Sequence, residues 1–107
     1  MRPIQLVAAL AALLLAGAGN AASSNKIDSR QAELLASSCF NCHGTDGRHG
    51  RDSIPAIGGK NQDVLLTQLL DFKADQVPGA TVMNRLARGF SDAELAAIAR
   101  YFSKIKN

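Results

Sequence analysis

The feature that most constrains this chain is a five-residue motif that contains both of its cysteines. Residues 39–43 read Cys-Phe-Asn-Cys-His, which is the Cys-x-x-Cys-His pattern of covalent haem attachment. Two thiols three positions apart on a helical turn can each bond one vinyl group of the same porphyrin, and a histidine directly after the second thiol can then bind the iron. The motif therefore predicts one covalent haem c held by Cys39 and Cys42, with His43 as an axial ligand of the iron.

The length of the chain supports this interpretation. With 107 residues it forms one domain at most. A domain of this size buries only a marginal core and commonly depends on an additional cross-link. A disulfide between Cys39 and Cys42 would close almost no loop and would contribute little. A covalently attached haem is the cross-link that fits the sequence.

Residues 1–21 have the features of a secretory signal peptide. Arg2 gives a basic start, residues 4–18 are almost entirely apolar, and small residues follow. The apolar run has the length of a signal-peptide core and falls short of the ~20 residues that a membrane span requires. We expect cleavage near Ala21, which leaves residues 22–107 as a single-haem domain in the periplasm. An uncleaved membrane anchor is the alternative.

The charge balance bears on possible partners. The whole chain carries 12 lysines and arginines against 9 aspartates and glutamates. Loss of Arg2 with the signal peptide leaves 11 against 9, and two ionised haem propionates would bring the mature protein close to neutrality. Nucleic-acid binding requires a concentrated basic surface. We therefore expect no nucleic-acid partner, and no membrane span in the mature chain.

Helix start signals divide the rest of the chain into helical segments. A capping box at Asp28 precedes a helix that should end near Ser38. Asn61 is a candidate N-cap of a helix that is apolar over a wide arc and should stop before residues 77–79. A second capping box at Ser91 starts a helix that runs almost to the C-terminus. No segment has a strand signal, so the prediction is an all-α fold.

Residues 44–60 are rich in glycine and should form an irregular loop wrapped around the haem. Residues 54–57 are the apolar part of this loop, so we expect Ile57 to lie on the haem-facing side. A ligating histidine usually donates a hydrogen bond from its second ring nitrogen. Pro55 has a carbonyl that its restricted φ holds still, which makes it the predicted acceptor for His43. A surface loop with a small apolar contact is the alternative.

Met83 is the expected second axial ligand. It is the sole methionine that remains after signal cleavage, and it follows a Pro78-Gly79 turn in a loop-like segment. Methionine more often fills a core, but a loop position weakens that alternative. His49 is a rival ligand, yet it lies only six residues after His43, so the opposite face of the haem is sterically hard to reach. Arg85 and Arg88 lie near Met83 in the sequence. We expect them to contact haem propionates, to contact a partner, or to form a solvated surface.

Taken together, these motifs resemble those of class I c-type cytochromes over essentially the whole mature chain. The shared positions occur in the family's order: Cys39, Cys42, His43 and Gly44, then Pro55, Ile57 and Gly59, then Met83, then residues 91–95 and 101–102. The resemblance implies a small all-α fold of about four helices wrapped around one covalent haem, with the first and last helices crossing beside it. It also implies iron ligation by His43 and Met83, and one-electron transfer.

A narrower resemblance is to the cytochrome subunit of flavocytochrome c sulfide dehydrogenase. Residues 72–74 and 81–91 are similar to that family around its methionine ligand. The resemblance implies that sulfide is oxidised on the FAD of a separate flavoprotein subunit. This chain would then be an electron-transfer subunit with no substrate site of its own, passing electrons to a downstream redox protein. Some members carry two haem domains, whereas this chain has a single Cys-x-x-Cys-His motif.

Three other functions remain open at this point. The first is a free soluble class I cytochrome c that delivers electrons to a terminal oxidase or another redox enzyme. The second is a haem sensor with an open coordination position, against which Met83 argues. The third is a thiol oxidoreductase or zinc module. Missing strand–helix alternation argues against a thioredoxin-like protein, and the lack of a further cysteine argues against structural zinc.

Overall fold

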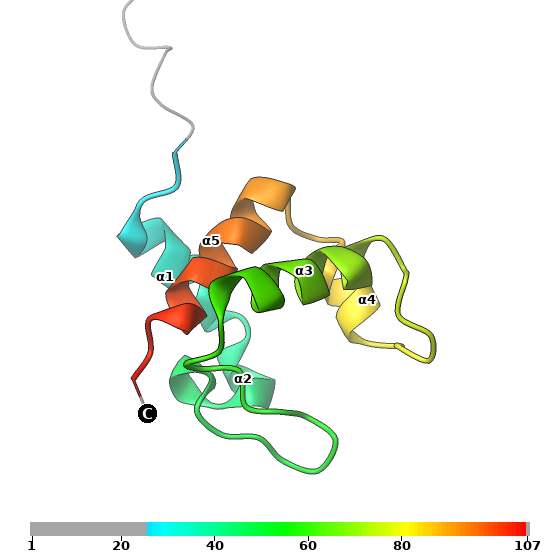
Figure 1. Ribbon diagram of the computed structural model, residues 1–107. Helices are drawn as coiled ribbons and strands as arrows, with labels where there is room; N and C mark the ends of the chain where they lie inside the picture. Colours follow the sequence, from blue (N-terminus) through cyan, green and yellow to red (C-terminus); the bar gives the residue numbers. More distant parts are fainter. Residues whose placement is uncertain (1–25, 107) are drawn as a thin grey trace, which may run out of the picture.

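The computed structural model describes residues 26–106, which contain helices and no named strand, and this confirms the predicted all-α class (Figure 1). A lone antiparallel bridge joins Arg51 and Ile54. The expected signal peptide, residues 1–21, lies outside the described residues. No helix within the described range is long and apolar enough to cross a bilayer. The elements are α1 (Ser29–Ser37), α2 (Phe40–His43), the 3₁₀ turn η1 (Thr45–Gly47), α3 (Gln62–Lys73), α4 (Met83–Ala87) and α5 (Asp92–Ser103).

The three long helices begin at the capping residues that the sequence indicates. Asp28 accepts a hydrogen bond from the backbone of Gln31 at 2.8 Å, and the Gln31 side chain accepts one in return. The same reciprocal pair forms at Ser91, at the start of α5. Asn61 accepts from two backbone N–H groups of the first turn of α3. Each bond satisfies a donor that a helix N-terminus would otherwise leave unpaired, so local chemistry sets these starts.

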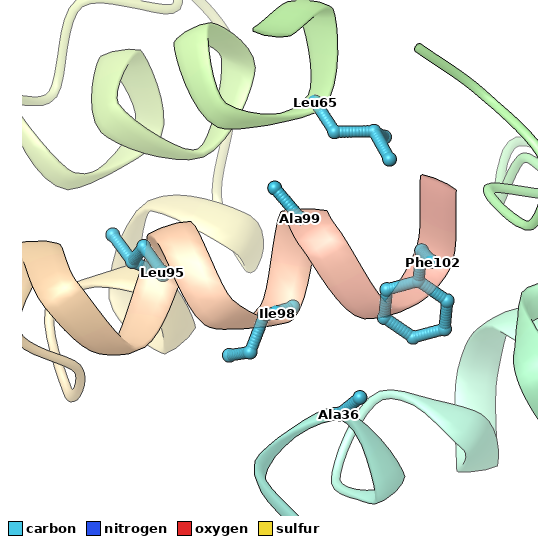
Figure 2. Packing of buried hydrophobic residues seen from close by; sticks show 6 residues of the cluster. All are labelled: Ala36, Leu65, Leu95, Ile98, Ala99 and Phe102. Atoms are coloured by element: carbon cyan, nitrogen blue, oxygen red, sulfur yellow. The ribbon is translucent and has the colours of Figure 1, made fainter. Parts of the chain in front are cut away.

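Helix α5 forms the centre of the core. It packs against α1 on one side and α3 on the other. Figure 2 shows Leu95, Ile98, Ala99 and Phe102 of α5 lying between Leu65 of α3 and Ala36 of α1. Ala36 and Ala99 are completely buried, and their small side chains let the helix backbones approach closely. Burial of each large apolar side chain stabilises the fold by about 1.5–3 kcal/mol.

The glycine-rich loop packs directly onto the end of α5. The backbone N–H of Gly59 donates to the carbonyl of Phe102 at 2.8 Å. Gly47 has a φ of 70°, and a Cβ atom there would lie 2.7 Å from Ile57 Cγ1. Since only glycine combines that conformation with that close approach, Gly47 lets the loop turn back against the core. The loop is therefore held against α5, and its expected path around a haem stays a prediction.

Candidate haem-binding site

The two cysteines lie on one helical turn. Cys39 directly precedes α2, and its carbonyl accepts a hydrogen bond from the His43 N–H at 3.0 Å. Cys42 lies in α2 itself, and both cysteines are free thiols. Residues three apart on a helical turn project from the same side. This is the arrangement that the sequence predicts for two thiols that bond one porphyrin.

The two thiols differ in their surroundings. Cys39 is half-buried against the core, whereas Cys42 is exposed. Burial raises the pKa of the Cys39 thiol, and the hydrogen bond with the Ser38 hydroxyl only partly offsets this rise. Neutral Cys39 is therefore favoured at neutral pH. The turn thus has one thiol anchored on the protein and one open to solvent.

His43 is held in a defined orientation by the predicted partner. Its side chain is only 8% exposed, and its Nδ1 lies 2.6 Å from the carbonyl oxygen of Pro55. A carbonyl only accepts hydrogen bonds, so Nδ1 carries the proton and donates it to Pro55. The other nitrogen, Nε2, then keeps its lone pair and is free to bind a metal. The contact expected between His43 and Pro55 is present.

The loop after His43 turns sharply and places His49 beside the motif. Gly44 has a φ of 83°, and a Cβ atom there would lie 2.8 Å from the Cβ of His49. The His49 N–H donates to the His43 carbonyl at 3.1 Å, while its side chain is exposed. His49 is thus tied through its backbone to the same segment as His43. Its role as a rival ligand stays an untested hypothesis.

Phe40, inside the motif, anchors α2 to the C-terminal helix. Its ring centroid lies 6.2 Å from that of Phe102 and 6.3 Å from that of Tyr101. Tyr101 in turn donates a hydrogen bond from its hydroxyl to Asp46, just after the motif, at 2.5 Å. Neither Phe40 nor Asp46 was among the site residues expected from the sequence. An aromatic residue between the two cysteines was the available signal for Phe40, but Asp46 offered none because its partner lies 55 positions away.

Apolar side chains of the loop and of α3 pack on the core and are buried only in part. Ile57 is half-buried and packs on the core. In α3, Leu65 is buried, whereas Leu66, Leu69 and Leu70 are half-buried. An apolar arc that protein atoms cover only partly leaves surface for a cofactor to cover, as the wide arc of this helix predicts. Contact of Ile57 with haem remains a prediction.

Met83 lies at the first position of the short helix α4, which corrects the expectation of a loop. The helix forms because residues 82–86 close a turn through backbone bonds from Arg85 and Leu86 to the Val82 carbonyl, both at 3.0 Å. Met83 itself is half-buried. Helix α4 packs against α3. Iron ligation by either residue stays a prediction.

The two arginines near Met83 have different surroundings. Arg88 Nη2 lies 3.9 Å from the carboxylate of Asp75, a weak exposed ion pair. Arg85 is exposed as well. Exposed guanidinium groups at this place can meet a partner protein or remain solvated. Contact of these two arginines with haem propionates stays a prediction.

The residues of this site fit a covalent c-type haem. Two free thiols share a helical turn, the buried His43 presents Nε2, and a partly uncovered apolar surface lies on α3. Among residues 26–106, no three side chains of histidine, cysteine, aspartate or glutamate are grouped so as to hold a bare metal ion. His43 is the residue on the motif side that would bind a porphyrin-bound iron.

Comparison with known proteins places this arrangement in a family, although no family model matches the chain. The chain is 41% identical over 75 residues to the cytochrome subunit of sulfide dehydrogenase of Chlorobaculum tepidum, covering 70% of this chain and 66% of that protein. It is 33% identical to cytochrome c4 of Azotobacter vinelandii, over 94% of this chain and 50% of that protein. It is 32% identical to cytochrome c-554(548) of Halomonas halodenitrificans, over 71% of this chain and 94% of that protein.

The extent of these matches differs. The chain spans half the length of the Azotobacter protein and just under two thirds of the Chlorobaculum subunit. It covers nearly all of the Halomonas cytochrome. Sequence identity over a whole relative, together with the helical fold and the Cys-x-x-Cys-His turn, identifies the family and its covalent haem c. The chain belongs to the class I c-type cytochromes.

Proposed function

We propose that this cytochrome is a one-electron carrier whose iron is bound by His43 on one side and Met83 on the other. The observation that carries the proposal is the hydrogen bond from His43 Nδ1 to the Pro55 carbonyl, because it directs Nε2 toward a metal. Haem c, when bound, supplies an iron that takes up and releases one electron. The residues of the chain determine how firmly that iron is held and how readily it is reduced.

His43 and Met83 act in opposite ways on the iron. Donation from Nδ1 to Pro55 strengthens the imidazole as an electron donor, and burial of the ring keeps water from the nitrogen. A thioether ligand such as Met83 favours the ferrous state and so raises the reduction potential. A rigid histidine and a thioether together allow the redox state to change without exchange of ligands.

Replacement of Met83 by alanine tests the ligand assignment. The ferric wild-type protein should show the weak near-infrared sulfur-to-iron charge-transfer band, and Met83→Ala should lack it. The reduction potential of the variant should also be lower, because a thioether favours ferrous iron. His49→Ala is the matched control and should leave both quantities unchanged. A Met83→Ala protein that keeps the band and the potential would show that another residue binds the iron.

We further propose that the protein is exported to the periplasm after cleavage near Ala21. The basic start and the apolar run of residues 4–18 support this proposal. Peptide mass analysis of the mature protein from a periplasmic fraction should place its N-terminus close to residue 22. Intact residues 1–21 on the mature protein would contradict it and favour a membrane anchor.

The proposed electron donor is the flavoprotein subunit of a sulfide dehydrogenase. The similarity to a relative named as the cytochrome subunit of that enzyme supports this assignment. The segment from Val77 to Met83 is the candidate docking surface, with Val77, Pro78, Ala80 and Val82 as its apolar residues. Val82 is 59% exposed, and Leu86, one helical turn further, is 52% exposed. Exposed apolar residues beside Arg85 and Arg88 have the apolar centre and polar rim of a protein interface.

Co-purification from the native source tests the partner. A flavoprotein should accompany the cytochrome, should show a flavin spectrum, and should stay bound at salt concentrations that screen exposed charges. The similarity to a relative named as a thiosulfate dehydrogenase electron acceptor supports a second candidate, a free carrier that serves a terminal oxidase or another redox enzyme. Such a carrier would elute alone, or would release its partner as soon as the salt concentration is raised.

A further inference from the structure

The helix that carries Met83 is short and lacks a side-chain cap, so it is held by its packing on α3 and by few polar contacts. Helix α4 has only five residues, and its N-cap, Val82, makes no side-chain capping bond. Helices shorter than about 12 residues are not stable in isolation. Of its residues, only Asn84 and Ala87 are buried. Ala87 contributes a small apolar contact where α4 packs on α3, and Asn84 is the buried polar residue of the helix.

Asn84 connects α4 to the end of α3. It follows Met83 directly and is only 9% exposed. Its Nδ2 donates a hydrogen bond to Asp75 Oδ1 at 3.2 Å. A carboxylate at neutral pH only accepts hydrogen bonds, so the amide must present its NH₂ group to Asp75. The orientation of the side chain is therefore set by this contact.

Asp75 is itself held firmly in place. It follows the C-cap of α3 with a φ of 59°, and its N–H donates to the Phe72 carbonyl at 3.0 Å. Arg88, which ends α4, lies 3.9 Å from the same Asp75 oxygen. In the described part of the chain, the side-chain polar contacts recorded for residues 83–88 thus all end on Asp75. One carboxylate just after α3 thus contacts side chains from both ends of the Met83 helix, through a hydrogen bond from Asn84 and a weak ion pair with Arg88.

The amide of Asn84 carries a local penalty. Its Oδ1 is buried and has no hydrogen-bond donor among the described residues. A buried acceptor without a donor is unfavourable, and an apolar side chain of similar volume would avoid that penalty. The residue is thus poorly suited to stabilise the whole fold, and well suited to fix one short helix through one directed bond.

We propose that Asn84 is a positioning residue for Met83: its bond to Asp75 holds α4 so that the Met83 sulfur stays on the iron. The proposal rests on the proposed ligation by Met83. It predicts that loss of the bond leaves the fold intact and makes the methionine easier to displace. Met83 must leave the iron before an external ligand can bind, so a less constrained α4 raises the share of molecules with an open iron.

Competition with imidazole on the ferric holoprotein tests the proposal. Asn84→Leu removes the bond together with the unpaired oxygen at similar volume. Asp75→Gly removes the acceptor at an exposed position and still permits a positive φ. In both variants the imidazole concentration that half-displaces Met83, read from the loss of the sulfur-to-iron band, should fall about three- to tenfold. The double variant should show no further fall, because both changes remove the same bond.

Two controls separate positioning from general stability. Asp75→Asn keeps an acceptor and tolerates a positive φ, so it should retain most of the wild-type resistance to imidazole. Denaturant midpoints measured on the same samples should change little in Asn84→Leu. If Asn84→Leu fails to fold with haem, Asp75→Gly alone decides the outcome.

The possible failures can be told apart. A wild-type protein without the sulfur-to-iron band would refute ligation by Met83, and the positioning role would fall with it. A wild-type band together with unchanged half-displacement in Asp75→Gly would overturn the positioning role and leave the ligation standing. Displacement that becomes easier only in proportion to a loss of denaturant stability would assign Asn84 to the general fold.

Discussion

The two sides of the proposed iron are built very differently. The motif side comprises residues 39–59 together with α1 and α5, and it is secured by buried aromatic packing and by bonds between distant segments. The methionine side comprises residues 75–88, where α4 has two buried residues and its recorded side-chain polar contacts end on one carboxylate. The histidine is thus held by the core of the protein, whereas the methionine is held by a short helix that packs on α3 and has few polar contacts.

This contrast has a functional reading. The motif side must keep a covalent cofactor and its first ligand in place, so it shares the stability of the whole fold. A segment with few buried contacts opens at lower free energy than the core does. Changes on the motif side should therefore alter unfolding of the protein, and changes on the methionine side should alter ligand exchange, potential and docking.

The largest effect is expected from the core of the motif side. Phe102→Ala removes a buried ring that packs on Phe40 of α2 and lies in the same core cluster as Ala36 of α1. The change should lower the free energy of unfolding by about 3–5 kcal/mol. Leu86→Ala on the methionine side is the matched control, and an exposed position should change that free energy by less than about 0.5 kcal/mol. Denaturant unfolding of both holoproteins measures the difference. Similar losses in the two variants would remove the proposed contrast.

An intermediate effect is expected at the bond between Tyr101 and Asp46. Tyr101→Phe removes only the hydroxyl that donates to Asp46, and should destabilise the protein by about 1–2 kcal/mol. Asp46→Asn keeps an acceptor and tolerates the positive φ of this position, so this variant should lose less unfolding free energy than Tyr101→Phe does.

The same bond predicts a dependence on pH. Burial, and then the hydrogen bond to Asp46, raise the pKa of Tyr101 from 10.0 to about 12. The folded protein thus keeps this proton more tightly than the unfolded chain does, so the contribution is complete below pH 10 and is lost as the pH rises through 12. The stability difference between wild type and Tyr101→Phe should shrink over that range. A constant difference would show that the hydroxyl does not titrate as described.

The smallest effect on stability is expected at the docking surface. Val82→Asp changes an exposed side chain and should alter the free energy of unfolding by less than about 0.5 kcal/mol. It should nevertheless weaken co-purification of the flavoprotein, because a charge enters the apolar centre of the proposed interface. Val64→Asp, at a half-exposed valine on the first turn of α3, is the control and should leave co-purification unchanged. Equal binding by both variants would place the interface elsewhere.

Much of the fold and of the motif side could be predicted because the responsible interactions are local. Capping boxes span four residues, and the haem motif spans five, so the sequence records each of them in one stretch. The acceptor role of Pro55 was also predictable, since a ligating histidine needs a second-nitrogen partner and a proline carbonyl is well held. The expectation of a loop around Met83 was wrong, because the short helix α4 forms there. This helix has no side-chain capping bond, and its packing on α3 is a tertiary contact, so no local signal marks it in the sequence.

By itself, the sequence determined the helical class, the helix starts and the chemistry of the motif, all of which depend on neighbours within a few residues. Only the tertiary structure decided that Asp46 meets Tyr101, that Phe40 packs on α5 and that Asn84 binds Asp75. The polar and aromatic residues that form these contacts are common along the chain, so residue type alone does not indicate which of them pair. Their partners become neighbours only when α5 and α3 pack, so the geometry of the packed helices selects them.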